Sequence, residues 1–294
     1  MEGVLTLNKP AGITSRQAVD HVLEVCPGIK AGHAGTLDPL ATGVLVICLG
    51  RATRLIQYVQ QLPKEYEATF LLGRRSDTLD TEGEVELLED PPQPTQQQVE
   101  ATLPRFTGRV LQVPPVFSAV KVEGRRAYRL ARAGKAPRLK PRPVEIHKLQ
   151  LLHYRYPELQ LRILCGSGTY VRSLGRDLAQ ALGTQAVMSR LCRTRVGQFR
   201  LEEALSPDQL TPELLSRVVQ PPLRAVEHLP QVALTAAQVR DLARGRPPRL
   251  PRQAPGRLTA AVAPQGHLAA VLESTPRGWR IAQNFAAGRS NTRR

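Results

Sequence analysis

The sequence predicts an α+β protein made of one large domain and a smaller C-terminal domain. The chain has 294 residues, of which 41% are hydrophobic, and this is enough to build a sizeable core. Short apolar or alternating runs bounded by turn residues predict strands, and amphipathic segments that follow a Ser or Thr cap predict helices. A proline-punctuated stretch near residues 228–230 places the predicted boundary between residues 1–228 and residues 229–294.

A strand and a helix are predicted at the start of the chain. Residues 3–8 are mostly apolar and lead into a Lys-Pro-Ala-Gly turn, which is typical of a strand that ends in a tight turn. Thr14 or Ser15 can then cap a helix, and Pro27-Gly28 ends it.

The segment from residue 32 to residue 43 is the one around which we expect the large domain to be organised. It is rich in glycine and leads directly into the apolar run 44–49, which predicts a loop followed by a buried strand. Because Pro39 biases Asp38 away from helical geometry, Asp38 is expected in a stiff loop on a rigid support. Such a position suits a catalytic carboxylate, although an Asp before a Pro is also a common turn residue.

The remaining predicted elements follow from the same rules of periodicity, capping and turn chemistry. In the large domain the predicted helices lie at 51–60, at 96–103 and in the segment that contains Leu174 and ends at Gly183. The predicted strands lie at 64–73, 143–153, 158–165 and 187–197. In the small domain the predicted elements are a helix at 236–244, capped by Thr235, and strands at 258–262 and 268–272.

The chain is strongly basic, with a formal net charge of +16, which predicts a polyanionic partner such as nucleic acid. An arginine-rich genome would produce a similar bias, so the distribution of the charges carries more information. Residues 105–148 hold twelve Lys or Arg and two Glu, and residues 229–294 hold eleven Arg, one Asp and one Glu. These two separate zones predict two places where a nucleic-acid backbone is bound.

Several classes of protein are disfavoured by what the sequence contains. No apolar run approaches the roughly 20 residues of a membrane span, and the first residues do not resemble a signal peptide, so we expect a cytoplasmic protein. The cysteines form no Cys-x-x-Cys pair, so we expect buried free thiols and neither a structural metal site nor disulfides. These cysteines are Cys26, Cys48, Cys165 and Cys192.

The loop motif resembles a known family. His33-Ala-Gly-Thr-Leu-Asp38-Pro-Leu-Ala-Thr-Gly-Val-Leu45 is similar to the catalytic motif of the TruB family of tRNA pseudouridine synthases. The resemblance implies that Asp38 is the catalytic carboxylate and that His33 occupies space left in the RNA.

Further motifs of the same family occur in the same order, so the resemblance extends over residues 3 to about 200. They are Lys9-Pro-Ala-Gly, the strand containing Tyr66, Ser76-Asp-Thr-Leu-Asp80, the segment from Pro114 to Tyr128, Gly168-Thr-Tyr170-Val-Arg172, and the following strand that contains Leu191. The resemblance implies three catalytic residues, namely Asp38, Tyr66 and Arg172. It also implies a set of RNA contacts, namely Lys9, His33, Asp80, Lys121, Arg126, Arg129, Tyr170 and Leu191.

The residues alone leave simpler interpretations open for some of these positions. Tyr66 is also compatible with an ordinary strand aromatic residue, and Asp80 with a surface turn residue. Arg126 and Arg129 would lie near one face if 126–133 were helical, but the same segment is compatible with a solvated basic loop.

The resemblance also implies a fold, a reaction and partners. The fold would be a mixed, largely antiparallel sheet flanked by helices, with a small PUA-like β-barrel at residues 229–294. The reaction would be the isomerisation of uridine to pseudouridine at position 55 of the tRNA T-loop, with base flipping and without a metal or cofactor. Arg172 would pair with Asp38, and Tyr66 would stack on the flipped base. The partner would be tRNA, through its T-arm and its acceptor stem, and the enzyme would act as a monomer.

Three other functions compete with this interpretation. A pure RNA-binding module would explain the charge but not the Asp38 loop with its Arg172 partner. A phosphoryl-transfer enzyme with an aspartyl nucleophile is disfavoured, because the second acid expected two residues after Asp38 is missing. A guide-RNA-dependent synthase subunit would carry long terminal extensions. A non-catalytic RNA-folding role is compatible with catalysis.

Overall fold

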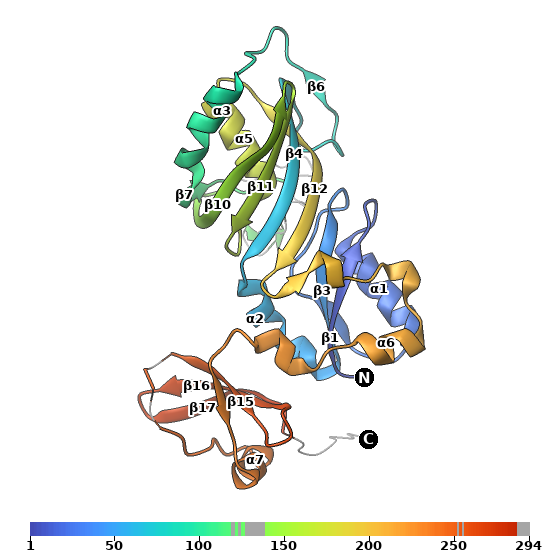
Figure 1. Cartoon of the computed structure of the whole chain (residues 1–294), viewed down its shortest axis with the longest axis vertical. Coiled ribbons are helices and arrows are strands. Elements are labelled where there is room, and N and C mark those ends of the chain that lie inside the picture. Colours follow the sequence, from blue (N-terminus) through green and yellow to red (C-terminus); the bar gives the residue numbers. More distant parts are fainter. Residues whose placement is uncertain (119–120, 123–124, 127–138, 252, 255, 287–294) are drawn as a thin grey trace.

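The computed structural model describes residues 1–118, 121–122, 125–126, 139–251, 253–254 and 256–286. The chain folds as the predicted α+β protein, with a large mixed sheet in the first two thirds of the chain and a four-stranded sheet near its end (Figure 1). Within the described ranges, no helix has the length and apolar character needed to cross a membrane.

The large sheet is mostly antiparallel. Its strands follow the order β1-β3-β12-β4-β11-β10-β7, with β2 added to β3 and β13 added to β12, and only the β3–β12 pair among them is parallel. Their bounds are β1 Gly3–Lys9, β2 Ala31–His33, β3 Thr42–Leu49, β4 Lys64–Leu72, β7 Gly108–Gln112, β10 Arg142–Arg155, β11 Glu158–Cys165, β12 Ala186–Val196 and β13 Phe199–Arg200. The predicted strands at 3–8, 44–49, 64–73, 143–153, 158–165 and 187–197 are therefore confirmed.

Three helices cover one face of this sheet and share its main core. They are α1 (Ser15–Val25), α3 (Gln96–Thr102) and α5 (Val171–Ala181), and in Figure 1 α5 lies behind β10 and β11 while α3 lies at the left edge beside β10. Thr14, one of the two caps predicted for the first helix, and Thr95, the cap predicted for the helix at 96–103, cap α1 and α3, and the structure adds reciprocal capping boxes with Gln17 and Gln98. Helix α5 contributes Leu174 and Leu178, which lie in one apolar cluster with Phe70 of β4.

The remaining short elements connect these layers. The helix predicted at 51–60 is a 3-10 segment, Gly50–Leu55, followed by α2 (Ile56–Gln61). Two small hairpins are β5 (Arg74–Arg75) with β6 (Glu86–Leu87) and β8 (Lys121–Val122) with β9 (Arg125–Arg126). Arg126, the first residue of the helix considered at 126–133, pairs with Lys121 across a strand ladder, and the rest of that range lies outside the described residues.

The C-terminal region forms its own sheet but shares a core with the large domain. After α6 (Pro212–Val218), the strands β14 (Gln231–Ala233), β15 (Leu258–Val262), β16 (Leu268–Thr275) and β17 (Gly278–Asn284) form a sheet in that order, with α7 (Ala236–Ala243) beside it. Val271 and Phe285 belong to one apolar cluster with Val4 and Val46 of the large sheet. The sequence predicted α7, β15 and β16 but not β14 and β17, and a PUA-like barrel remains a prediction.

Candidate active site

Two buried residues hold the loop that carries Asp38. The Lys9 ammonium donates hydrogen bonds to three backbone carbonyls, among them that of Pro39 at 3.2 Å. Ser15 Oγ accepts from the Leu37 N–H at 2.8 Å and donates to the Leu37 carbonyl at 3.0 Å. The backbone is therefore fixed on both sides of Asp38, which is the rigid support that the sequence predicted. Because the Lys9 side chain is fully buried, in this structure it supports the loop and offers no surface to RNA.

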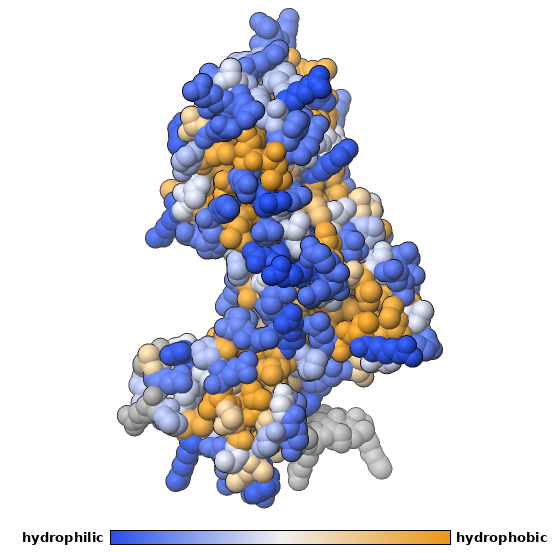
Figure 2. Space-filling model, in the orientation of Figure 1, coloured by the Kyte–Doolittle hydropathy of each residue, from blue (hydrophilic) through white to orange (hydrophobic). Residues whose placement is uncertain are grey.

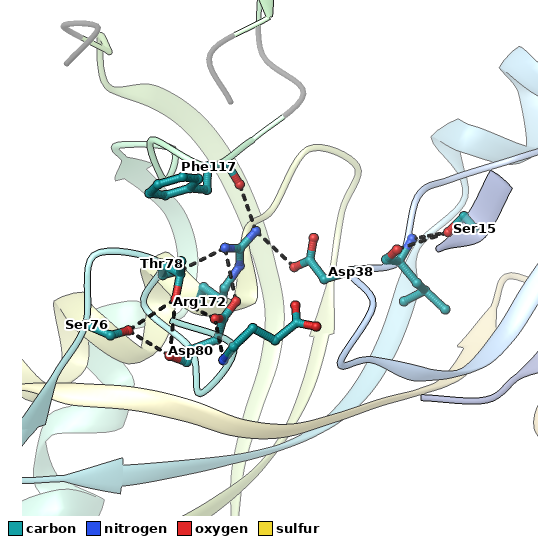
Figure 3. A network of polar contacts seen from close by, with 9 residues as sticks. Ser15, Asp38, Ser76, Thr78, Asp80, Phe117 and Arg172 are labelled. Carbon is teal, nitrogen blue, oxygen red and sulfur yellow. Dashed lines mark hydrogen bonds and ion pairs between the residues drawn. The ribbon is translucent and has the colours of Figure 1, made fainter. Parts of the chain in front are cut away.

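Arg172, the second residue of α5, lies between two carboxylates (Figure 3). Its Nη2 lies 3.0 Å from Asp38 Oδ2, and its Nη1 lies 3.2 Å from Asp80 Oδ2. The same two nitrogens donate to the carbonyls of Phe117 at 3.0 Å and Thr78 at 2.8 Å. The guanidinium group is thus held in one orientation, and the predicted Arg172–Asp38 pair is present.

Asp80 is a buried member of this network rather than a surface turn residue. Only 3% of its side chain is exposed, and its Oδ1 accepts from Thr78 Oγ1 at 2.6 Å and from the Glu82 N–H at 3.1 Å. The Asp80 segment also pairs with Met188 of β12, which ties it to the large sheet. The structure therefore gives Asp80 a place behind Arg172, away from the surface that RNA would reach.

The start of α5 is positioned by a side-chain clamp. Gln112 at the end of β7 accepts from the Tyr170 N–H at 2.7 Å and donates to the Tyr170 carbonyl at 3.0 Å. Since Tyr170 directly precedes α5, this clamp fixes the start of the helix and therefore the position of Arg172 in its first turn. No local pattern in the sequence predicts this role of Gln112, because the two segments are far apart in the chain.

An open cleft of about 320 Å³ lies beside Asp38 and Arg172. Its walls are the loop 35–38, the loop 166–170 and the first residues of α5, and its floor comes from β4 and β12. The floor side chains are Tyr66, Leu191, Lys64 and Arg193. The cleft therefore unites the predicted Asp38, Tyr66, Tyr170, Arg172 and Leu191 in one cavity.

The carboxylate of Asp38 is placed at the boundary between protein and solvent. About 35% of its side chain is exposed, whereas that of Arg172 is 7% exposed. Burial in the loop raises the pKa of Asp38, and the charge and hydrogen bond of Arg172 oppose this rise. Burial also raises the pKa of Tyr66, so its phenol stays protonated at neutral pH. The site thus presents a carboxylate held by a cation next to an aromatic floor.

The other predicted RNA contacts lie outside this cleft or outside the described residues. His33 is the last residue of β2, and its buried Nδ1 has no hydrogen-bond partner in the described structure. Lys121 and Arg126 lie in the β8–β9 hairpin, of which only the backbone is described. Arg129 lies outside the described residues. Their contacts with RNA remain predictions.

Sequence reasoning missed two cations in the floor of the cleft, Lys64 and Arg193. The period-two alternation of β4 places Lys64 on the same face as Tyr66, so the pattern that predicted the strand also contained this information. Arg193 was visible only as one of several arginines in β12. No group of three or more His, Cys, Asp or Glu that could hold a metal ion occurs in the part of the chain that the structure describes.

Comparisons with known proteins show which family the chain is similar to. Residues 22–171 match the family described as TruB family pseudouridylate synthase (N terminal domain). A curated protein of Stutzerimonas stutzeri named tRNA pseudouridine synthase B is 40% identical over 258 residues, which are 85% of this chain and 84% of that protein. A protein of the same name from Dehalococcoides mccartyi is 38% identical over 290 residues, or 97% of each chain. The solved structure of an H/ACA RNP bound to a substrate RNA containing 2′-deoxyuridine is 25% identical with a TM-score of 0.75, over 97% of this chain and 85% of that chain.

Proposed function

Because the chain belongs to the TruB family of pseudouridylate synthases, we propose that it converts a uridine of tRNA into pseudouridine. The net charge of +16 supports an RNA substrate, since phosphate contacts by Lys and Arg supply most of the affinity for nucleic acids. The observation that carries the proposal is the Asp38 carboxylate held 3.0 Å from Arg172 at the edge of an open cleft.

The target proposed here is uridine 55 in the T-loop. A base stacked inside a folded loop has to be flipped out before an enzyme can act on its glycosidic bond. A cleft of about 320 Å³ with Tyr66 on its floor is suited to receive one base and to stack on it. Leu191 beside Tyr66 adds apolar contact, and Tyr170 closes the opposite wall.

Asp38 is the group that we propose to act on the ribose. Its carboxylate would either add to C1′ or remove the C2′ proton when the N1–C1′ bond breaks, and both routes need the ionised form. Arg172 favours that form through its charge and hydrogen bond. Asp80, itself fixed by Thr78, holds Arg172 from the other side. Tyr66 would stack on the base and assist proton removal from C5.

RNA outside the cleft would be bound by the basic zones. Lys121, Arg126 and Arg129 belong to the zone 105–148, and His33 would occupy space left in the RNA by the flipped base. We propose that residues 1–228 form the catalytic domain and that residues 229–294 form a PUA-like RNA-binding domain near the acceptor stem. The enzyme would act in the cytoplasm as a monomer and without a cofactor.

The proposal is tested with the variant Asp38→Asn. An amide keeps the shape of the side chain but can neither add to C1′ nor take a proton at neutral pH, so no pseudouridine should form in a single-turnover assay with excess enzyme. Binding of tRNA, measured by filter binding, should remain near that of the unmodified protein, because distributed basic residues supply the affinity.

The matched control is Asp208→Asn, which removes an exposed carboxylate far along the chain. It should retain full activity. Formation of pseudouridine by Asp38→Asn at the original rate would rule out the proposed role of Asp38. An inactive original protein on tRNA with uridine at position 55 would contradict the proposed substrate.

A further inference from the structure

Two cations lie side by side with Tyr66 in the floor of the cleft. In β4 the side chains of Lys64 and Tyr66 point to the same buried face, and the register between β4 and β12 places Arg193 directly opposite Tyr66. Lys64 is 7% exposed and Arg193 is 1% exposed, and both line the cleft. A planar group stacked on Tyr66 would therefore lie near two buried positive charges. Arg193 is on the neighbouring strand about 5 Å away, and Lys64 is two residues along β4 on the same face.

Neither cation has an acidic partner within the described part of the chain. Arg193 donates from Nε to the Val44 carbonyl at 2.7 Å and from Nη2 to the Gly35 carbonyl at 3.1 Å, and Lys64 donates to the Gln60 carbonyl. Burial, together with the charge of Arg193, lowers the pKa of Lys64 to about 8. Burying cations without a counter-charge is costly, so such groups indicate a function that uses the charge.

We propose that Lys64 and Arg193 stabilise the negative charge that develops on the uracil ring when the N1–C1′ bond breaks. This inference rests on the proposed function. The electron pair of the bond leaves with the base and spreads over its N1, O2 and O4 atoms, while Asp38 either bonds to C1′ or takes the C2′ proton. When C5 then bonds to C1′, the pair that is delocalised onto C5 forms the new bond, and the Asp38–C1′ bond breaks or the C2′ proton returns from Asp38. A base assisted by Tyr66 takes the C5 proton and N1 gains a proton, so the product is an isomer of the substrate.

The depth of the two cations favours the base over a phosphate as their partner. A flipped base enters a cleft first, whereas the backbone phosphates stay near the mouth, and side chains that are 1% and 7% exposed lie too deep to meet them. Uridine is neutral before cleavage, so the cations interact more strongly with the transition state than with the bound substrate. Interactions of this kind raise the rate rather than the affinity.

The test uses Lys64→Met and Arg193→Lys, with Lys30→Met and Arg195→Met as controls. Each control removes one positive charge, and Arg195 lies on β12 in a partly exposed ion pair with Glu65. Lys64→Met should lower the single-turnover rate by roughly 10²–10³-fold, as expected for the loss of a buried group that stabilises developing charge. Its tRNA affinity should change no more than that of Lys30→Met. Arg193→Lys keeps the charge but not the planar fork, and it should be less impaired than Lys64→Met if folding is intact by circular dichroism.

A substrate with 5-fluorouridine at the target position separates electrostatic stabilisation from a structural role. Fluorine withdraws electrons and makes the base a better leaving group, so the loss caused by Lys64→Met should be about tenfold smaller on this tRNA when consumption of the target nucleotide is measured. Equal losses on both tRNAs, or weaker binding with an unchanged rate, would overturn the inference. In either case pseudouridine formation by the original protein would leave the proposed function intact, and its absence would refute that function itself.

Discussion

At the scale of single residues, the site depends on Arg172, which forms ion pairs with two carboxylates of different solvent exposure. Asp38 faces the cleft with about a third of its side chain exposed, while Asp80 is buried, with one carboxylate oxygen paired to Arg172 and the other accepting two hydrogen bonds. Because Asp80 cannot leave its position, it fixes Arg172, and Arg172 in turn fixes the group that we propose to react. The arrangement explains how Asp80, although it is buried and does not reach the cleft, can affect the proposed reaction through Arg172.

Asp80→Asn tests this dependence. The amide removes one of the two negative charges beside Arg172, so the guanidinium group should shift and Asp38 should lose its orientation. We expect the single-turnover rate to fall by roughly 10²-fold, as for a displacement of about 1 Å in an active site, with tRNA affinity unchanged. The control is Asp77→Asn, an exposed acid in the same loop. Full activity of Asp80→Asn would show that Arg172 is held by its backbone contacts alone.

The dependence of activity on pH tests the charge of Lys64. A lysine is charged below its pKa, and that of Lys64 is lowered to about 8, so kcat/KM should fall as the pH rises through about 8. Among the groups that face Lys64, burial raises the pKa of the Cys165 thiol to about 11 and also raises the pKa of the Tyr66 phenol, so neither ionises in this window. Lys9, whose pKa burial also lowers to about 8, can contribute through the Asp38 loop.

The variant Lys64→Met separates the two lysines in this pH profile. It should be slower and should show a smaller fall above pH 8. An unchanged fall would assign the whole effect to Lys9.

At the scale of elements, the close approach of α5 to the sheet determines where Arg172 lies. Gly175 faces β4, and a Cβ atom at this position would lie 2.1 Å from a ring carbon of Phe70. Glycine is therefore required by packing, although it is unfavourable inside a helix. The first turn of α5 is in addition held by Gln112, so the position of Arg172 follows from contacts on both sides of the helix start.

Gly175→Ala should therefore destabilise the protein instead of stabilising its helix. We expect a loss of about 1–3 kcal/mol in the free energy of unfolding, because the added methyl group overpacks the interface between α5 and β4. The measurement is urea denaturation followed by circular dichroism. Gln180→Ala, at an exposed position of the same helix, should cause no such loss. A stabilised Gly175→Ala would mean that α5 can move away from the sheet without cost.

At the scale of the whole molecule, the C-terminal region is attached through a shared apolar core and carries much of the positive charge. Residues 229–294 hold eleven Arg with two acids, and Figure 2 shows the outline of the molecule hollowed between this region and the upper part of the large domain. Deleting the region would uncover apolar residues such as Val4 and Val46. Substitutions on its surface are therefore a cleaner test of RNA docking than a truncation.

Replacing Arg240, Arg244 and Arg249 together by Gln should weaken binding of full-length tRNA. These side chains are exposed on α7 and the segment that follows it, so their loss should not disturb the fold. The slope of log affinity against log salt should decrease by about 2 to 3 if all three contact phosphates, whereas binding of an isolated T-arm hairpin should stay the same. The control is Arg217→Gln on α6. Equal losses on both RNAs would place these arginines near the T-arm instead.

Most elements of the large domain could be predicted because their signals are local. Alternation predicted β4, β-branched runs predicted β3, and the threonine caps predicted α1 and α3, since each rule concerns residues close together in the chain. The strands β14 and β17 were missed. Their pairing partners, and not their own composition, make them strands.

The same distinction applies to the site. The amino-acid sequence by itself determined that Asp38 lies in a stiff loop before a core strand, and its motifs identified Arg172 and Tyr66. Only the tertiary structure decided that Asp80 is buried behind Arg172, which carbonyls of the loop Lys9 binds, and that Lys64 and Arg193 lie under the cleft. The physical reason is that these relations join segments up to 158 residues apart, such as Gly35 and Arg193, and depend on strand register and helix packing that no local pattern encodes.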